Sequence, residues 1–480
     1  MADHEMQASP LDRTAVTLLD RTTPIPAACS WKPSQFNVQS TTDDGWLLLW
    51  NSYSGSVNSF KPHQRDGVLD LLSPQGTRGP DTGIRRYLEE RGYLVRDNVE
   101  EIRRVQYDFG SKQHRTDRLE LILLASEDCN FRCNYCYEDF EKGTMLPEVR
   151  EGVKNLALSR IANLESMSVW WFGGEPLYGM AAIDDIAPFL VDLCEREGVA
   201  YSSHMTTNGY LLTPDVMDRM LDYKVTDFQI TVDGMQEDHD RNRPGRSGQG
   251  TYEVILDNLR AIAARPERDF IVAIRVNFDK GNLPRMEEFL KTIQDDFRDD
   301  ERFEIAFHAV GRWGGDNDAE LDVCGTTESH DARLRLVKEA RKLGLGVANA
   351  KGPGPGAGHN VCYAVRPYNL IVGATGRLMK CTIDLDKADH NVVGHINPDG
   401  TCEIDVDRMS LWTEPAFERD TGCQSCHVMA ACQGVHCPKI RIDSGRRPCP
   451  PVRRTAKKQL VDYFEATTAS RDALRSGSNT

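Results

Sequence analysis

Three cysteines that lie close together constrain this chain more than any other feature. Cys129, Cys133 and Cys136 have the spacing CX3CX2C and follow the apolar run 119–125. Three thiolates on one short loop can hold three corners of an iron–sulfur cube, whereas a [4Fe–4S] cluster held wholly by protein takes four cysteines. The spacing therefore predicts a cluster with one iron left open to a ligand. A zinc knuckle is the alternative for such a triplet.

Length, charge and cysteine content limit the classes of protein that remain. The chain has 480 residues, a formal net charge of −15 and 14 cysteines. This length is enough for two or three domains with ample cores. Because binding through phosphates needs a basic face, the negative charge argues against a nucleic-acid partner. In a reducing compartment, which keeps thiols free, this many cysteines favours metal ligation over disulfides.

Two absences in the sequence predict a cytoplasmic protein with no membrane partner. No stretch reaches the roughly 18 consecutive apolar residues of a membrane span. Residues 1–6 lack the basic end and apolar stretch of a signal peptide.

The N-terminal part of the chain predicts a small α+β module. Residues 1–34 are polar and without a sustained period, so we expect a flexible N-terminus there. Alternating apolar residues and turn signals then predict a module over 35–110. Its expected strands are 36–39, 46–50, 57–60 and 93–95, and its expected helices are 62–72 and 82–91.

From residue 119 strands and helices alternate regularly, which predicts βα units and a parallel sheet over 115–350. A Gly/Pro loop at 351–358 cannot continue a helix or strand and marks the expected boundary with a cysteine-rich domain at 351–452. A helix from 453 to 466 and a polar tail would fill 453–480. The expected barrel strands are 119–125, 168–172, 201–206, 227–232, 270–276 and 303–309, with helices at 147–164, 183–197, 214–223, 252–264 and 284–297.

Polar motifs follow several of these strands. Gly173-Gly174-Glu175-Pro176 comes directly after the second strand, where glycines let the backbone pass close to a ligand and a carboxylate could accept hydrogen bonds from an ammonium group. Thr207 and Asn208 end the third strand and Thr231 the fourth. Arg275 lies inside an apolar strand and needs an anionic partner, because unpaired burial of a charge is costly. That partner would be a ligand carboxylate or a structural salt bridge.

Together, the cysteine triplet, the GGEP sequence and these strand ends resemble the radical S-adenosylmethionine (radical SAM) enzymes. In that family the methionyl amino and carboxylate groups of SAM chelate the open iron. Reduction of the cluster then yields a 5′-deoxyadenosyl radical that abstracts hydrogen. The resemblance implies a partial (β/α)6 TIM-like barrel with its chemistry at the C-terminal ends of the strands.

The resemblance also implies a set of SAM contacts. Gly173, Gly174, Glu175 and Pro176 would bind the methionyl amino group. Tyr135 would lie near the adenine, and Arg275 is a candidate for the SAM carboxylate. Thr207, Asn208 and Thr231 match strands that contact SAM in the family.

The cysteines beyond residue 361 resemble the SPASM extension, which carries two auxiliary [4Fe–4S] clusters. By position, the second cluster would take Cys423, Cys426, Cys432 and Cys449, and the first Cys362, Cys381 and Cys437. The fourth position of the first cluster would be open or filled by Cys324, Cys402 or His436. A zinc ribbon is the alternative reading of this segment. Cys29 and Cys194 are expected to be unligated, Cys194 on the core face of a helix.

One charged stretch is expected to have no catalytic role. Residues 238–243, Asp-His-Asp-Arg-Asn-Arg, resemble a segment common in SPASM-containing maturases, but a charged loop is usually solvated. Asp233, a few residues earlier, is a candidate base at the radical site.

The N-terminal module weakly resembles the leader-peptide recognition modules of peptide-modifying enzymes, which would take a leader as an added strand. A structural cap on the barrel is the alternative. The whole pattern implies a maturase of a ribosomally synthesised precursor peptide (RiPP) that forms an intramolecular crosslink, thioether or carbon–carbon. Its partners would be the precursor with its leader and an electron donor such as ferredoxin or flavodoxin. An anaerobic sulfatase maturase, which forms formylglycine, and a non-catalytic metal-binding scaffold are the alternatives.

Overall fold

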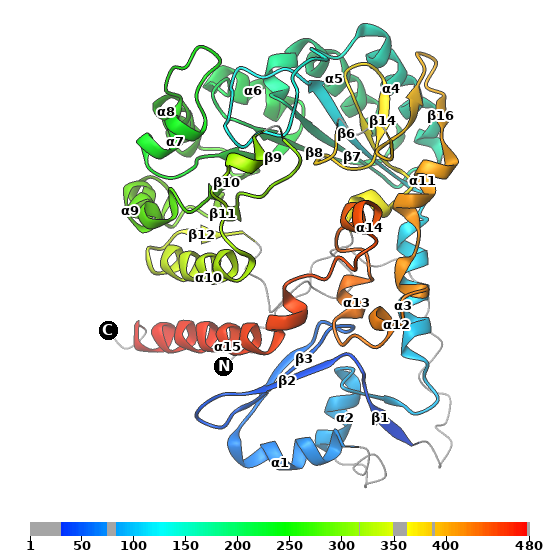
Figure 1. The fold of residues 1–480 in the computed structure, drawn as a ribbon, viewed down its shortest axis with the longest axis vertical. Coiled ribbons are helices and arrows are strands. Elements are labelled where there is room, and N and C mark those ends of the chain that lie inside the picture. Colours follow the sequence, from blue (N-terminus) through cyan, green and yellow to red (C-terminus); the bar gives the residue numbers. More distant parts are fainter. Residues whose placement is uncertain (1–29, 74–82, 316, 349–361, 386–388, 478–480) are drawn as a thin grey trace.

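The computed structural model describes residues 30–73, 83–315, 317–348, 362–385 and 389–477 (Figure 1). Residues 1–29 of the expected flexible N-terminus, Cys29 among them, and the Gly/Pro loop 351–358 lie outside these ranges. Among the described residues, the structure contains no helix that is both long enough and apolar enough to cross a bilayer.

A large sheet forms the centre of the molecule, and six of its strands are parallel and neighbours in chain order, as predicted for a partial barrel. The prediction of this fold is confirmed, and each strand begins and ends within two residues of the expected positions. The six strands are β6 (Arg118–Ser126), β7 (Ser166–Gly173), β8 (Ala200–Thr207), β9 (Val225–Thr231), β10 (Ile271–Phe278) and β11 (Phe303–Ala309).

Helices pack against the outer face of this sheet (Figure 1). The 18-residue helix α5 buries an apolar stripe that includes Ile183, Ile186 and Leu190, which is the periodic pattern that predicted it. The five helices expected between the strands are α4 (Pro147–Arg160), α5 (Met180–Glu197), α6 (Pro214–Asp222), α8 (Tyr252–Ala263) and α9 (Met286–Phe297). The sequence did not predict α7 (Gln236–Asn242) and α10 (Thr326–Lys342).

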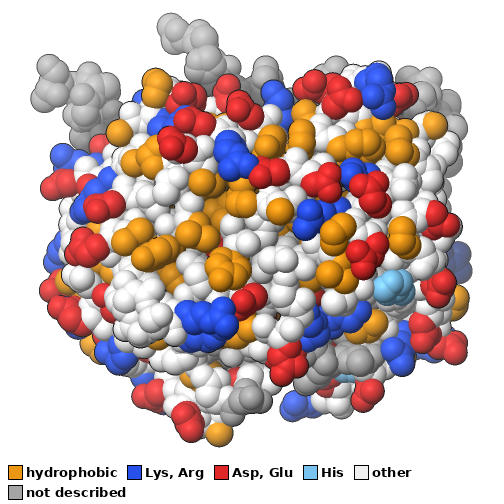
Figure 2. Space-filling view, turned by 90° about the horizontal axis from the view of Figure 1, so that it is seen from above, with side chains coloured by type: hydrophobic (Ala, Val, Ile, Leu, Met, Phe, Trp, Pro, Cys, Tyr) orange, Lys and Arg blue, Asp and Glu red, His pale blue; other side chains and the backbone are white. Residues whose placement is uncertain are grey.

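Seen from above, this face of the molecule carries acidic and basic side chains interspersed with apolar ones (Figure 2). Ion pairs also join neighbouring helices of the barrel: Lys154 of α4 lies 2.9 Å from Asp185 of α5, and Arg219 of α6 pairs with Asp184 of α5. Exposed pairs of this kind stabilise a fold only slightly.

The sheet continues across the expected domain boundary. Strand β13 (Asn369–Val372) pairs in parallel with β6, and β14 (Arg377–Met379), β15 (Val392–Ile396) and β16 (Cys402–Ile404) follow in antiparallel order. With β12 (Gly346–Val347) at the other edge, the sheet has 11 strands. Strands of three to five residues are too short to show a period in the sequence, which is why none was expected here.

Four short helices follow the last strand, and Cys423 and Cys432 lie in two of them. They are α11 (Val406–Thr413), α12 (Thr421–Gln424), α13 (Met429–Cys432) and α14 (Pro438–Ser444). The last helix, α15 (Val452–Gly477), extends well beyond the expected end at 466, so the predicted polar tail is largely helical.

The N-terminal module contains a three-stranded antiparallel sheet, β2 (Asn37–Thr41), β3 (Leu47–Asn51) and β4 (Val57–Phe60). It also has β1 (Trp31–Pro33) paired with β5 (Leu94–Arg96), and the helices α1 (Pro62–Leu71) and α2 (Gly83–Glu90). Helix α3 (Glu101–Gln113) leads from the module to the barrel.

The module packs on the cysteine-rich segment rather than on the barrel (Figure 1). Trp50 of β3 shares an apolar cluster with Val428 and with Val452 and Leu460 of α15. Phe36 belongs to a second cluster, which includes Cys423. The alternative of a cap on the barrel therefore needs correction, because the apolar faces of the module are buried against residues 423–464.

Candidate functional site

The three cysteines of the CX3CX2C loop lie at the C-terminal end of β6, and a distant segment, 242–246, holds their loop by its backbone. Arg132 N donates to Pro244 O at 2.9 Å, and Asn134 N donates to Asn242 O at 2.9 Å. Arg246 N donates in return to Asn130 O at 2.8 Å. Because these bonds alternate along both segments, the loop is fixed like a short strand pair.

The donor set of this loop fits an iron–sulfur cluster. Burial raises the pKa of all three thiols, that of Cys136 to about 12, and at Cys129 the nearby Glu175 carboxylate raises the pKa further. The three thiols also act on one another electrostatically, so they lie close together. Phe131 N already donates to Cys129 Sγ at 3.3 Å. Metal ligation needs thiolates, and burial disfavours their negative charge. A bound metal would supply the positive charge that stabilises them.

The glycines of Gly173-Gly174 are required by close packing against the cysteine loop. A Cβ on Gly174 would lie 2.6 Å from Asp128 O, and one on Gly173, where φ is +121°, would lie 2.1 Å from Ser126 O. Gly174 N donates to Ser126 O at 3.0 Å. Only residues without a side chain can bring β7 this near to the loop.

Groups of the chain itself use most of the hydrogen-bonding capacity of the Glu175 carboxylate. It accepts hydrogen bonds from Leu177 N at 3.0 Å, Thr207 Oγ1 at 2.7 Å and Asn208 N at 2.7 Å, and it is fully buried. A carboxylate offers roughly four lone-pair positions, so three are used here. The carboxylate therefore ties the end of β7 to the end of β8, while its contact with a ligand ammonium group stays a prediction.

The side chain of Asn208 reaches the cysteine loop. Its Nδ2 donates to Asn130 Oδ1 at 2.7 Å and lies 3.9 Å from Cys129 Sγ. The ends of β7 and β8 and the cysteine loop thus form one connected group of polar side chains.

The predicted partner of Arg275 was left open, and the structure removes one alternative. Arg275 pairs in register with Thr231 on the neighbouring strand, and its Nε donates to Asn277 Oδ1 at 2.8 Å. Within the described ranges no carboxylate lies at ion-pair distance from its guanidinium. Among the described residues a structural salt bridge therefore does not account for this half-buried cation, and its contact with an anionic ligand stays a prediction.

Tyr135, between Cys133 and Cys136, holds its hydroxyl in a buried polar network. The hydroxyl donates to Asp233 and accepts from Arg243 Nη1 at 2.7 Å and Asn277 Nδ2 at 3.2 Å. The other oxygen of Asp233 accepts from Asn277 N at 3.1 Å. Asp233 is fully buried with both oxygens engaged, so the expectation of a free base at this position is not supported.

Residues 238–243 are the main site residues that sequence reasoning missed. They form most of α7 and its end, and Asp238, His239, Asn242 and Arg243 are all buried. The expectation of a solvated loop is wrong, because the guanidinium of Arg243 is needed at Tyr135. The resemblance of this stretch to a maturase segment was the one signal that could have revealed its role.

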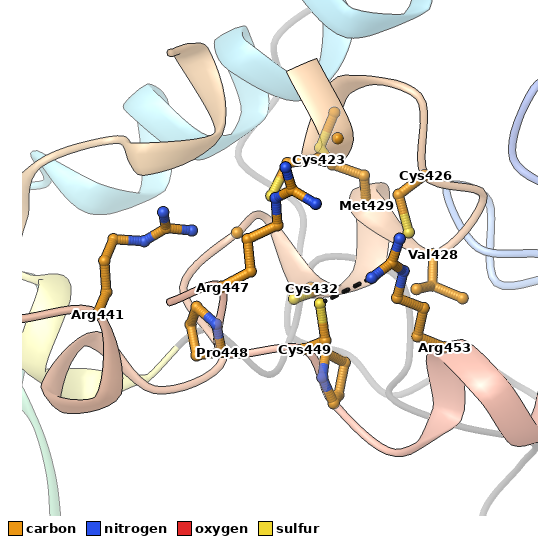
Figure 3. A pocket seen from close by; sticks show the side chains of 13 residues that line it. Cys423, Cys426, Val428, Met429, Cys432, Arg441, Arg447, Pro448, Cys449 and Arg453 are labelled. Atoms are coloured by element: carbon orange, nitrogen blue, oxygen red, sulfur yellow. Dashed lines mark hydrogen bonds between the residues drawn. The ribbon is translucent and has the colours of Figure 1, made fainter. Parts of the chain in front are cut away.

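Four of the later cysteines surround one pocket (Figure 3). They come from α12, α13 and the segments around them. Burial raises the pKa of Cys432 to about 11. The four are Cys423, Cys426, Cys432 and Cys449, the same set that the sequence assigned to the second auxiliary cluster. Four converging thiols fit a fully protein-held [4Fe–4S] cluster.

A second group forms around Cys381, whose pKa burial raises to about 12 and on which Cys362 and Cys437 also act. These are the three cysteines assigned to the first auxiliary cluster. Of the candidates for a fourth ligand, His436 directly precedes Cys437, whereas Cys324 lies just before α10 and Cys402 lies in β16. Cys194 is buried in α5, as expected for an unligated thiol.

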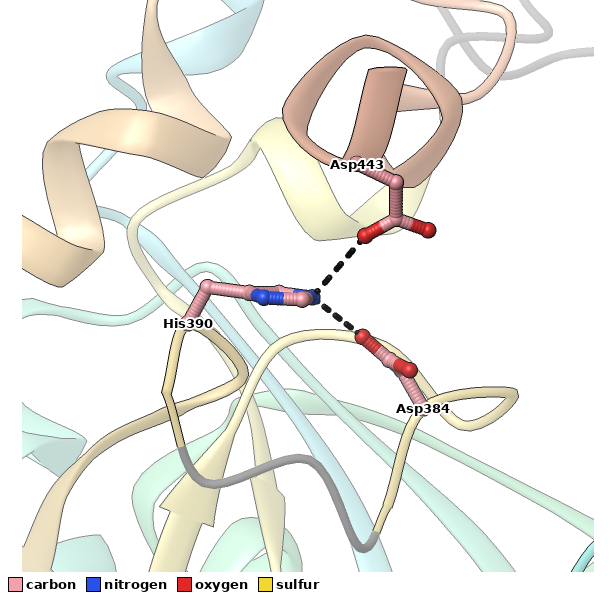
Figure 4. A group of neighbouring side chains, drawn as sticks. All are labelled: Asp384, His390 and Asp443. Carbon is pink, nitrogen blue, oxygen red and sulfur yellow. Dashed lines mark hydrogen bonds and ion pairs between the residues drawn. The ribbon is translucent and has the colours of Figure 1, made fainter. Parts of the chain in front are cut away.

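An ion-pair network fixes α14, which begins after Cys437, against the segment after Cys381 (Figure 4). His390 Nε2 lies 2.5 Å from Asp384 Oδ2 and 3.4 Å from Asp443 Oδ1. Lys439 Nζ lies 3.3 Å from the other oxygen of Asp384 and 2.6 Å from Asp443 Oδ2. Because the Lys439 ammonium group already contacts both carboxylates, we interpret this cluster as an ion-pair network rather than a cation site.

Comparisons with known proteins agree with this geometry. Residues 123–293 match the family model of the Radical SAM superfamily. An uncharacterized protein of Methanocaldococcus jannaschii is 28% identical over 174 residues, 36% of this chain and 57% of that protein. The PqqA peptide cyclase of Bradyrhizobium diazoefficiens is 25% identical over 226 residues, 47% of this chain and 55% of the cyclase. The chain thus spans little more than half the length of these two relatives.

A similar fold occurs in the solved structure of native anSMEcpe with bound AdoMet and Kp18Cys peptide. The TM-score is 0.54 at 16% sequence identity, over 76% of this chain and all of that one. The structural likeness covers 76% of this chain, whereas the family model matches only the 171 residues from 123 to 293. The likeness therefore extends beyond the segment that the family model matches.

Proposed function

We propose that this chain, whose residues 123–293 belong to the Radical SAM superfamily, is an enzyme that crosslinks a ribosomally synthesised precursor peptide in the cytoplasm. The observation that carries the proposal is that one buried and two half-buried thiols, the Gly173-Gly174-Glu175 turn and Arg275, which has no carboxylate partner among the described residues, all lie on the parallel strands of one sheet or just after them. When bound, a [4Fe–4S] cluster and SAM supply a 5′-deoxyadenosyl radical that takes a hydrogen atom from the peptide.

The chain's own residues would position these groups. Cys129, Cys133 and Cys136 would hold the cluster, and the segment 242–246 keeps their loop in place. The Arg275 guanidinium would bind the SAM carboxylate, a charge-assisted contact that a buried arginine favours strongly. Thr231 ends the neighbouring strand β9, and Asn208 directly follows β8, one strand further along the sheet.

Two further groups of cysteines support an oxidative outcome. Cys423, Cys426, Cys432 and Cys449 would hold one auxiliary cluster, and Cys362, Cys381 and Cys437 the other, with His436 as the nearest candidate for its remaining position. Closing a bond after loss of one hydrogen atom releases one further electron and a proton. The auxiliary sites would receive that electron.

The N-terminal module offers an edge for a leader peptide. Helix α15 packs on β2 and β3, and β4 is the outer strand on the other side of the three-stranded sheet. Val57 and Asn58 of β4 are half-buried and Ser59 is exposed. A leader added along β4 would gain main-chain hydrogen bonds, the usual mode of strand addition. The peptide substrates named for the cyclase relative support a peptide here as well.

The first test is anaerobic and needs no peptide. The protein is reconstituted with iron and sulfide, mixed with SAM and dithionite, and assayed for 5′-deoxyadenosine. We expect about 12 irons per chain and deoxyadenosine formation. Cys133→Ala should abolish deoxyadenosine, whereas Cys194→Ala, a buried thiol far from the site, should not. A Cys133→Ala protein that still forms deoxyadenosine would contradict the proposal.

A second test concerns the substrate. Candidate precursors from small reading frames beside the gene are incubated with the reconstituted protein and analysed by mass spectrometry. A crosslink appears as the loss of one pair of hydrogen atoms from the peptide. Formylglycine in a sulfatase-derived peptide, with no crosslink in any precursor, would instead favour the sulfatase maturase.

A further inference from the structure

A concentrated basic segment surrounds the most exposed cysteine of the four-cysteine pocket. Residues 439–458 contain eight Lys and Arg but one Asp, in a chain whose formal net charge is −15. Cys449 is the exposed member of the four, whereas Cys423 is buried and Cys426 and Cys432 are half-buried. Charge and access to the pocket therefore coincide in one short stretch of chain.

Three arginines point toward this pocket (Figure 3). Arg453 Nη1 donates to Cys449 Sγ at 3.1 Å. Arg447 and Arg441 lie 2.7 Å and 3.5 Å from the Asp420 carboxylate, which neutralises one of their two positive charges. The positive charge of Arg453 acts on the cysteine sulfur atoms.

More positive charge lies on the outer side of the same segment. Arg446, Arg454 and Lys457 are exposed, and no described carboxylate lies at ion-pair distance from any of them. Lys457 follows Arg453 by one helical turn, so both lie on one face of α15. Arg454, three residues before Lys457, is the neighbour of Lys457 on the exposed side of α15, whereas Ala456 and Leu460 are buried against the N-terminal sheet. The basic side chains therefore face outward around Cys449.

We propose that this basic surface, which comprises Arg446, Arg453, Arg454 and Lys457 around Cys449, docks a small electron-transfer protein with an acidic surface. The inference rests on the proposed function, because it takes Cys449 to be a ligand of the second auxiliary cluster. One electron passes from the reduced auxiliary site to the oxidised carrier, which gains that electron, while the proton released by bond formation goes to solvent. No other bond forms or breaks in this step.

Charge complementarity selects this partner over others. Opposite charge around a redox site raises the encounter rate and orients the partner so that its own redox centre approaches the exposed ligand. A nucleic acid is disfavoured by the acidity of the chain as a whole. The partner can be small, because only one cysteine of the pocket is exposed.

The test compares two charge reversals of equal size. In Arg454→Glu/Lys457→Glu the basic surface is reversed, and in the control Arg103→Glu/Lys112→Glu two exposed residues of α3 change in the same way. Both double variants also carry Cys133→Ala, so that the SAM-binding cluster is absent and does not contribute to the measured electron transfer. The reduced protein is mixed with an oxidised, acidic plant-type [2Fe–2S] ferredoxin, and the rate of electron transfer is followed by stopped flow.

At low ionic strength we expect the reversal to slow electron transfer about tenfold or more, and the control to leave it unchanged. The two rates should converge at high salt, because screening removes the steering. Equal rates for reversal and control at low salt would overturn the inference. Calorimetry of ferredoxin binding to the protein before iron reconstitution should give a weaker affinity for the charge reversal than for the control.

The two failures are distinguishable. A protein that takes up no iron at the four cysteines would overturn the proposed ligation, and the inference with it. A reducible cluster that transfers electrons equally well in all variants would overturn the docking surface alone. Tighter binding of an acidic peptide than of the ferredoxin would assign the surface to a peptide instead.

Discussion

The guanidinium of Arg243 donates a 2.7 Å hydrogen bond to the hydroxyl of Tyr135, which lies between two of the proposed cluster ligands. The two residues are 108 positions apart in the chain, and Arg243 is only 6% exposed. Arg243 also lies over the ring of Phe131 at 5.7 Å. A buried cation thus supports the cysteine loop from behind, next to the backbone bonds that the segment 242–246 makes to it.

Replacing Arg243 by Gln should destabilise the fold and loosen the cysteine loop. Burial raises the pKa of Asp233, and the charge of Arg243 opposes this rise. Because the change removes that buried cation, we expect a loss of about 3 kcal/mol of unfolding free energy. Arg246→Gln is the matched control: Arg246 pairs with Asp128 at 3.1 Å but its side chain is 55% exposed, so we expect about 1 kcal/mol or less. Denaturant unfolding of both variants measures the difference, and equal losses would contradict the role of Arg243.

His239 should make stability depend on pH below neutrality. It is fully buried, and burial together with the charge of Arg243 lowers its pKa well below 6.5. Its Nδ1 accepts from Asp233 N at 3.1 Å, so Nε2 carries the proton toward Thr251. Below pH 6.5 the unfolded chain binds a proton that the folded chain does not, and stability falls as the pH falls.

The measurement is the melting temperature as a function of pH. Relative to His239→Gln, which cannot titrate, the wild type should lose about 1.4 kcal/mol per pH unit between pH 6.5 and the lowered pKa. The exposed His63→Gln variant should follow the wild type. Parallel curves for wild type and His239→Gln would show that this imidazole is protonated in the folded state.

Periodicity was sufficient to predict the barrel but not what supports its site. Strand β11 was predicted to the residue, because Phe303, Ile305 and Phe307 alternate with residues on the other face. Residues 238–243 were misjudged, since a run of charged side chains carries no sign that a distant tyrosine needs one of them. Long-range contacts such as Arg243 to Tyr135 leave no local pattern in one sequence.

The candidate ligands were easier to predict than the contacts of the other side chains. The resemblance to the SPASM extension assigned four cysteines to one cluster, and these four line one pocket. For Glu175 the sequence suggested a ligand contact, yet its carboxylate accepts three hydrogen bonds from the chain. Whether a polar side chain has all its hydrogen-bond partners within the chain depends largely on backbone N–H groups. Every sequence has these groups, and no sequence pattern shows where they point in the fold.

Loss of one cysteine of the pocket should remove one cluster and no more. Cys432→Ser should lower the iron content by about four atoms per chain after reconstitution. Cys402→Ser, in β16 beyond the cysteine groups, should leave the content unchanged. Deoxyadenosine formation should persist in both variants, because the three cysteines after β6 are intact. An unchanged iron content in Cys432→Ser would contradict the ligation proposed for this pocket.

Phe36 connects the N-terminal module to the four-cysteine pocket and should protect it. It is fully buried in one apolar cluster with Cys423, Met429 and Ala430. Phe36→Ala should cost about 3–5 kcal/mol through the lost burial and the cavity left behind. Phe60, buried in a separate cluster within the same module, provides the control. Phe60→Ala should destabilise the module without opening its contact with the cysteine-rich segment.

Alkylation separates the two effects of these substitutions. In the protein before iron reconstitution, iodoacetamide labelling of Cys423 and Cys426 is quantified by mass spectrometry under native conditions. Phe36→Ala should accelerate labelling of both, since removal of the ring exposes the apolar side of the pocket to solvent. Phe60→Ala should label like the wild type. If both variants label equally fast, the module protects the cysteines only through overall stability, and the packing of Phe36 on the pocket has no separate role.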